Sequence, residues 1–141
     1  MFIEQISVFI ENRPGRLAET LTFLAARGQD IRAFSVAEKA DFGILRMIVH
    51  NPDAAVAALK EKGFTAKKTE VLGILIGNAP GSSVKAIQVL SDAGINIEYT
   101  YAFVTPQAGG AFVLLRVQDN VRAAEILRQA GVALVGHKDI F

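Results

Sequence analysis

The stretch NRPGRL, residues Asn12–Leu17, decides the fold because NAPGSS repeats it at residues Asn78–Ser83. Each stretch follows an apolar run and precedes apolar residues at helical spacing. Asn, Pro and Gly are turn residues, so one such stretch would indicate only that a strand ends and a helix begins. Two stretches in the same setting indicate that the chain contains a duplicated unit.

The duplication extends along the chain. Asn78 and Asn12 are 66 positions apart, and the same offset relates Gly94 to Gly28. Later landmarks differ by 68 positions, as Gly131 and Gly63 do. We therefore expect a two-residue insertion in the second copy, within TPQAGG. Extra residues in a hairpin loop cost little free energy, which favours this position.

Each copy shows the same order of secondary-structure signals. An alternating or apolar run, IEQISVFIE or EVLGILIG, predicts a strand that ends at the turn. A helix follows and ends at Gly28 or Gly94, as helices with a C-terminal glycine do. Two strands joined by ADFG or TPQAGG then predict a hairpin. A second helix is expected over 52–62 and 119–130, and the short runs FTAKKT and VALVGHK predict the last strands.

The repeated unit is therefore βαββαβ, and the fold class is α+β. Two helices should cover one face of an antiparallel four-stranded sheet. We expect domains at residues 1–69 and 70–141, joined at Thr69 and Glu70 without a Gly/Ser/Pro linker. About 70 residues bury only ~60% of their unfolded surface, so one unit alone would be marginal. A tandem pair in close contact is the expected arrangement.

Composition narrows the classes of function. The chain carries 15 basic and 14 acidic residues, a formal charge of +1, so it lacks the charge that attracts nucleic acid or an anionic membrane. It contains no cysteine, which excludes disulfides, thiolate metal sites and a cysteine nucleophile. No run approaches the ~18 apolar residues of a membrane span. We expect a cytoplasmic protein.

The repeated turn has chemistry of its own. Proline presets the entry into the helix, and glycine lets another group approach the backbone closely. The N–H groups of a helix's first turn then form a site for a carboxylate or phosphate. The alternative is that Asn12 and Asn78 only cap their own helices and bind nothing.

The run NRPGRLAETLTFLAARGQDIRAFSVAE resembles the opening of an ACT domain, the small-molecule regulatory module of amino-acid metabolism, and NAPGSSVKAIQVLSDAGINIEYTYAFV resembles a second. Together the copies cover nearly the whole chain. The resemblance implies two ferredoxin-like units that pair side by side into a continuous sheet. It also implies an amino acid bound between domains, against the strand–helix loop of one unit and the second strand of a neighbour.

The resemblance implies contact residues in both copies. In the first copy they are Asn12, Pro14, Gly15, Arg16, Leu17, Ile31, Ala37 and Glu38. In the second copy they are Asn78, Pro80, Gly81, Ser82, Ser83, Asn96, Ile97 and Tyr99. Main-chain N–H groups suit a carboxylate, while an Asn oxygen or Glu38 suits an ammonium group. The family commonly has an aliphatic residue where Ser83 stands, so we expect the first loop to bind the ligand, and the second a different ligand or none.

Other candidate residues give weaker indications of a function. Tyr99, Tyr101 and Phe103 alternate on one strand, as in RNA-binding sheets, but the third strands lack the basic-aromatic pattern of that family, which favours packing. His50 and His137 have no neighbours at metal-ligand spacing, so no metal is expected. No cofactor is expected either.

The expected function is therefore that of a non-enzymatic, amino-acid-binding regulatory protein. A catalytic reading would need a reactive side chain beside the loop, for which only Glu38 or Tyr101 is available. Exposed sheet edges favour a homodimer, with an enzyme or regulator of amino-acid metabolism as partner. The structural alternative is a dimerisation or adaptor module without ligand. The identity of the amino acid stays open, because Arg16 favours an acidic ligand, and Leu17, Phe34 and Val36 an apolar one.

Overall fold

The structure is a computed structural model that describes residues 2–105 and 109–141. The chain divides into two compact units, which are described separately. The first unit comprises Glu4–Thr69, and the second comprises Glu70–Phe141 together with the start of the chain up to Ile3. Strand β4 (Thr65–Ile76) carries the chain from the first unit into the second.

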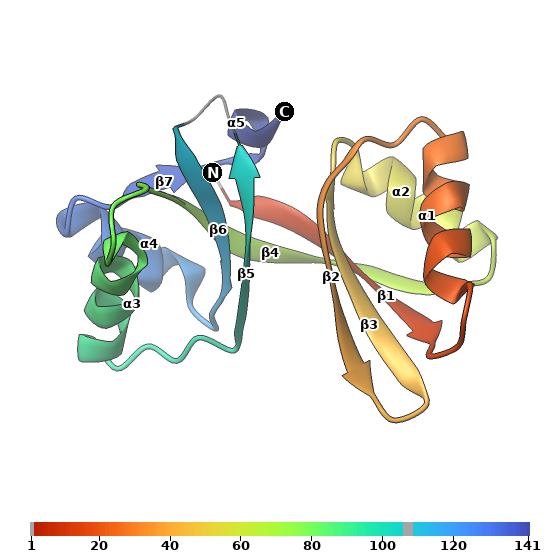
Figure 1. Cartoon of the computed structure of the whole chain (residues 1–141), viewed down its shortest axis with the longest axis horizontal. Helices are drawn as coiled ribbons and strands as arrows, with labels where there is room; N and C mark the ends of the chain where they lie inside the picture. Colours follow the sequence, from red (N-terminus) through yellow and green to blue (C-terminus); the bar gives the residue numbers. More distant parts are fainter. Residues whose placement is uncertain (1, 106–108) are drawn as a thin grey trace. The chain divides into compact units, whose positions relative to one another are not determined.

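The first unit has the order βαββαβ. Its elements are β1 (Ile3–Glu11), α1 (Arg16–Ala26), β2 (Ile31–Lys39), β3 (Phe42–Val49), α2 (Pro52–Glu61) and the start of β4. Strand β3 pairs antiparallel with both β1 and β2, and the strand order is β2-β3-β1-β4. Both helices lie on one face of this sheet (Figure 1).

The second unit repeats this order. Its elements are the rest of β4, α3 (Ser82–Asp92), β5 (Tyr99–Thr105), β6 (Gly110–Arg116), α4 (Asn120–Gln129), β7 (Ala133–Val135) and a short terminal helix, α5 (His137–Ile140). The strand order is β7-β4-β6-β5, with antiparallel pairs throughout. The α+β fold of two ferredoxin-like units is thereby confirmed.

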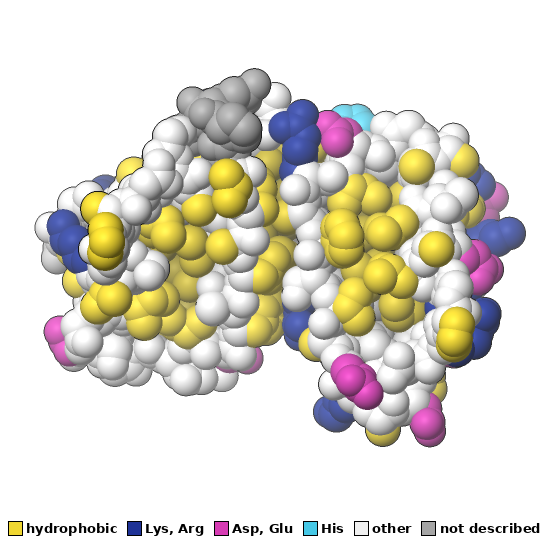
Figure 2. All heavy atoms as spheres, in the orientation of Figure 1, with side chains coloured by type: hydrophobic (Ala, Val, Ile, Leu, Met, Phe, Trp, Pro, Cys, Tyr) yellow, Lys and Arg dark blue, Asp and Glu magenta, His cyan; other side chains and the backbone are white. Residues whose placement is uncertain are grey.

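Each unit has its core between its sheet and its helices. In the first unit, alternate residues of β1 such as Ile6 and Val8 pack with Leu24 of α1 and Leu59 of α2. The period-2 pattern of the strand meets the 3.6-residue pattern of the helices, as amphipathic elements require. The equivalent cluster of the second unit contains Leu72, Ile74, Leu90, Leu115 and Leu127. Hydrophobic side chains also reach the surface of both units in the view of Figure 2.

Three element boundaries differ from the sequence-based expectation. The runs FTAKKT and EVLGILIG are one 12-residue strand, β4. Strand β5 begins only at Tyr99, because Ile95 and Ile97 are already packed against the second core in irregular chain. The run VALVGHK is a strand only to Val135, after which the Asp139 carboxylate accepts a 2.6 Å hydrogen bond from the Gly136 N–H and starts α5.

The two hairpins differ by two residues. Lys39 pairs with Phe42, so residues 40 and 41 form the first turn. Thr105 pairs with Gly110, so residues 106–109 join the second pair of strands. The expected two-residue insertion within TPQAGG is therefore confirmed by the strand registers, although residues 106–108 themselves lie outside the described part of the chain.

Candidate functional site

The strand–helix loops of both units end at a glycine in the left-handed conformation. Gly15 has φ 86° and Gly81 has φ 84°, values that favour glycine because a Cβ atom is strained there. Neither helix has a side-chain cap at its N-terminus. The alternative reading, in which Asn12 and Asn78 cap the helices, is therefore wrong. Their side chains instead bond to the hairpin turns, at Ala40 and Gly109.

The first turn of α1 has some N–H groups with a described acceptor and some without one. The N–H of Arg16 bonds to the Arg13 carbonyl at 3.3 Å, and that of Glu19 to the Gly15 carbonyl at 2.9 Å. Among the described residues, no acceptor serves the N–H groups of Gly15, Leu17 and Ala18. Such donors at the positive end of a helix dipole suit an anionic group.

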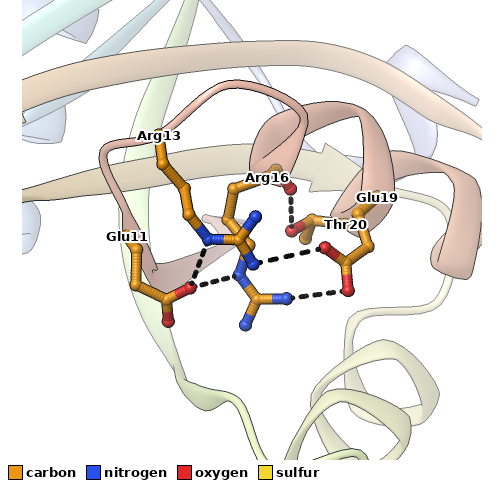
Figure 3. A network of polar contacts seen from close by, with 5 residues as sticks. All are labelled: Glu11, Arg13, Arg16, Glu19 and Thr20. Atoms are coloured by element: carbon orange, nitrogen blue, oxygen red, sulfur yellow. Dashed lines mark hydrogen bonds and ion pairs between the residues drawn. The ribbon is translucent and has the colours of Figure 1, made fainter.

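A cluster of ion pairs surrounds this loop (Figure 3). Arg16 Nη1 lies 3.1 Å from Glu19 Oε1, and Arg16 Nε lies 2.9 Å from Glu11 Oε2 at an angle outside hydrogen-bond geometry. Arg13 contacts the same two carboxylates at 3.5 and 3.7 Å. The Arg16 guanidinium also lies 4.4 Å from the ring centre of Phe64. Arg16, with 17% of its side chain exposed, is therefore held by the protein itself.

A pocket of about 180 Å³ lies between this loop and the β2–β3 hairpin of the first unit. Its lining residues are Ile10, Glu11, Asn12, Arg13, Leu17, Val36, Glu38 and Gly43. The strand register explains the space. Gly43 stands opposite Ile10 of β1 and Glu38 of β2, and residues directly opposite share a face of the sheet. Because Gly43 has no side chain, a gap remains between its two neighbours.

Glu38 brings an uncompensated charge to this pocket. Its carboxylate accepts one hydrogen bond, from Asn12 Nδ2 at 3.4 Å. Within the described part of the chain, Glu38 takes part in no ion pair, whereas Glu11 has two arginine partners. The pocket therefore joins an acceptor for a cation with Leu17, whose N–H is an unsatisfied donor. This arrangement can bind a small zwitterion.

The second loop lines a different pocket. The lining of this pocket, which has a volume of about 420 Å³, includes Pro80, Gly81, Ser82, Lys85 and residues 131–133. Ser82 Oγ donates a 2.7 Å hydrogen bond to the Ala79 carbonyl, which makes it part of the loop. Asn78 and Ser83 are exposed and lie outside the lining of this pocket.

The register also identifies the residues of the second unit that correspond to the first pocket. Ala111 stands opposite Ile76 and Val104, as Gly43 stands opposite Ile10 and Glu38. In the second unit, the methyl group of Ala111 therefore occupies the gap that Gly43 leaves in the first unit. The isopropyl group of Val104 stands where the first unit has the Glu38 carboxylate. The two copies keep the same loop but differ in the chemistry beside it.

The remaining expected contact residues line neither of the two loop pockets. Ile31 pairs with Val49 at the other end of β2, and Ala37 is on the sheet face opposite to that of Glu38. Tyr99 pairs with Arg116 at the start of β5. Ile97 packs on the second core, while Asn96 lines a pocket of about 290 Å³ beside the first turn of α4. Pro14 is exposed in the first loop.

Sequence reasoning missed four lining residues, Ile10, Glu11, Arg13 and Gly43, and used Val36 only as an apolar cue. Gly43 did carry a signal, because a glycine inside an apolar strand often marks a close approach. Over the residues that the structure covers, no three His, Cys, Asp or Glu side chains are placed to hold a metal ion. In the same residues, no helix is long and apolar enough to cross a membrane.

Comparison with known proteins identifies the family. A family model described as an ACT domain pair matches residues 1–141. Protein BT0572 from Bacteroides thetaiotaomicron has a similar crystal structure, with a TM-score of 0.92 and 39% sequence identity over 99% of this chain and 96% of that chain. The regulatory subunits of aspartate kinase from Thermus thermophilus and Thermus flavus share the fold, with TM-scores of 0.64 and 0.61. Their sequence identities are 22% and 18%, over 90% and 91% of this chain and 91% and 92% of theirs. No curated protein matches the chain. The chain belongs to the family of ACT domain pairs.

Proposed function

We propose that this protein is a regulatory module that binds a free amino acid in the pocket between the first strand–helix loop and β2. The observation that supports the proposal is that one pocket contains both a carboxylate for a cation and backbone N–H donors for an anion. Among the described residues, the Glu38 carboxylate has no cationic partner, and the N–H groups of Leu17 and Ala18 in the first turn of α1 have no acceptor. An α-amino acid carries both complementary groups on one carbon atom.

The proposed binding mode follows from these groups. The ligand's ammonium group donates to Glu38 and to the side-chain oxygen of Asn12, which the bond from Asn12 Nδ2 to Glu38 already holds beside that carboxylate. Its carboxylate accepts from the N–H groups of Leu17 and Ala18. Charge-assisted hydrogen bonds of this kind are about twice as strong as neutral ones, so a small ligand can be held by few contacts.

Regulation would follow from a difference in affinity between two arrangements of the protein. A ligand shifts such an equilibrium only by its differential affinity for the two states. We propose a homodimer in which the site meets a neighbouring domain, and an enzyme or regulator of amino-acid metabolism as the partner. Membership of the ACT family supports this reading. Binding on the order of micromolar to millimolar, about −8 to −4 kcal/mol, would suit a metabolite sensor.

A thermal-shift screen against the standard amino acids at millimolar concentration tests the proposal. A ligand at 100 times its dissociation constant adds about 2.7 kcal/mol, which is a shift of several degrees for a chain of this size. Glu38→Gln keeps the shape of the side chain and removes its charge, and should abolish the shift. Glu98→Gln, an exposed carboxylate of the second unit, is the matched control and should keep it.

Two results would overturn the proposal. One is a folded parent protein that no amino acid stabilises, in which case the adaptor alternative takes its place. The other is an amino acid that stabilises the parent and Glu38→Gln equally, because the site would then lie elsewhere.

A further inference from the structure

Resting on the proposed function, we infer that the first pocket selects amino acids with a short, uncharged side chain, and that Gly43 sets the limit on size. The inference names the class of ligand from the volume, the lining and the strand register of the pocket.

The volume limits the ligand to a small amino acid. The pocket has a volume of about 180 Å³. This is below the range of about 300–1,000 Å³ typical of sites for larger ligands. The backbone atoms of an amino acid take up most of this space, so a short side chain fits and an aromatic ring does not.

The lining excludes a charged side chain. Ile10 is 4% exposed, Leu17 is half-buried, and Val36 completes an aliphatic wall. A charged group placed against this wall would lose hydration, which is costly. The charged lining residues offer it little compensation, because Glu11 and Arg13 already form ion pairs and Glu38 is assigned to the ligand's ammonium group. An acidic side chain would also lie near the carboxylates of Glu11 and Glu38, where like charges repel.

Gly43 forms the floor of the pocket. A Cβ atom at this position would lie 3.4 Å from Val36 Cγ1 and 3.6 Å from Ile10 Cγ1. These are ordinary van der Waals distances, so the fold accepts an alanine at this position. The added methyl group would nevertheless occupy the space between β1 and β2 that the ligand's side chain needs.

In the second unit, a side chain occupies the position that corresponds to Gly43. Ala111 stands at the position of Gly43, and Val104 at that of Glu38. At these described positions, the second unit therefore lacks both the glycine gap and the carboxylate of the first pocket.

Isothermal titration calorimetry with glycine, alanine, serine, valine, phenylalanine, aspartate and lysine tests the inference on the parent, Gly43→Ala and the control Ala111→Gly. One extra or missing methylene group in an apolar pocket changes the affinity for a ligand about 10- to 200-fold. For the parent, we expect at least tenfold weaker binding of phenylalanine, aspartate and lysine than of the best short, uncharged ligand. Gly43→Ala should lower valine affinity at least tenfold more than glycine affinity, and Ala111→Gly should change neither.

The outcomes separate the two proposals. Binding of an amino acid that depends on Glu38, but prefers an aromatic or charged side chain, overturns the inference and leaves the proposed function standing. Unchanged valine binding by Gly43→Ala also overturns the inference. A parent that binds no amino acid overturns both. Val36→Ala enlarges the pocket from its exposed side and should admit larger side chains, so the inference stays testable if Gly43→Ala folds poorly.

Discussion

The side-chain amide of Asn78 donates a 3.0 Å hydrogen bond to the carbonyl oxygen of Gly109, and so ties the second strand–helix loop to the β5–β6 hairpin. Asn12 makes the same bond to Ala40 at 3.3 Å in the first unit. Both acceptors are left-handed turn residues, with φ 68° and 52°. The bond is kept although the hairpins differ in length, so the repeated asparagine positions the loop against the hairpin.

The first prediction concerns this bond. Asn78→Ala removes the donor and should lower the free energy of unfolding by about 0.5–1.5 kcal/mol, the usual net value of one hydrogen bond. Urea denaturation followed by circular dichroism measures the change. Asn96→Ala is the control, because Asn96 makes no hydrogen bond to other described residues, and it should stay within about 0.5 kcal/mol of the parent. Equal stability of the two variants would show that the bond contributes nothing.

The second prediction concerns Gly15. Its φ of 86° is strained for any residue with a Cβ atom, although no atom lies within 4 Å of the position that a Cβ would take. The strain is therefore in the backbone, of the order of 1–2 kcal/mol. Gly15→Val should destabilise the protein by at least this amount, and Gly15→Asn by less, because asparagine tolerates the left-handed region. Thermal denaturation without ligand distinguishes the two, and equal losses would contradict the backbone explanation.

The fold could be predicted from the sequence because repetition supports each local signal. The Asn-x-Pro-Gly turn, the helix-ending glycines and the hairpin residues occur twice, so each weak signal confirmed the other. The end of the chain was predicted less well, because α5 depends on one local bond, from the Gly136 N–H to Asp139. Propensity gives little indication of a single capping interaction.

The pocket could be predicted only in part. Asn12, Leu17 and Glu38 were expected, and they line one space. Gly43 and Ile10 were not, since their part in the pocket depends on cross-strand register, which is set by the whole hairpin. The engagement of Arg16 by Glu11, Glu19 and Phe64 likewise depends on tertiary contacts.

The third prediction concerns Gly73 in β4. A Cβ atom there would lie 2.3 Å from Ile3 Cδ1, 2.8 Å from Val135 Cγ2 and 3.1 Å from the Val135 carbonyl oxygen. Gly73→Ala should therefore cost about 1–3 kcal/mol of stability, the range of overpacking in a filled core. Urea denaturation of the variant measures this loss.

A second substitution distinguishes overpacking from other causes. Val135→Ala removes the Cγ2 atom that would lie 2.8 Å from the new methyl group, so the double variant should lose less than the sum of the two single variants. A double-mutant cycle gives this coupling, expected at about 0.5 kcal/mol or more. Additive losses would contradict the steric explanation.

The last prediction concerns the dependence of stability on pH. Lys68 Nζ contacts the carboxylate of Asp53 and lies 3.0 Å from Glu4 Oε2. The hydrogen bond to Asp53, followed by the contact with the Glu4 carboxylate, raises the pKa of Lys68 above its ordinary value of 10.5. The folded state therefore holds this proton more tightly than the unfolded state does. The resulting stabilisation is fully present below pH 10.5, and is lost as the pH rises through the higher pKa of the folded state.

Lys68→Met tests this sign. The stability difference between the parent and this variant should be constant from about pH 7 to about pH 9 and should shrink at higher pH, because the lysine of the unfolded chain titrates first. Salt at about 1 M should also reduce it, since this exposed pair is screened. Lys67→Met is the control, because Lys67 forms no ion pair with the described residues and should show neither dependence. A difference that grows above pH 10.5 would mean that the ion pair lowers the pKa of Lys68, contrary to the geometry of its two carboxylate partners.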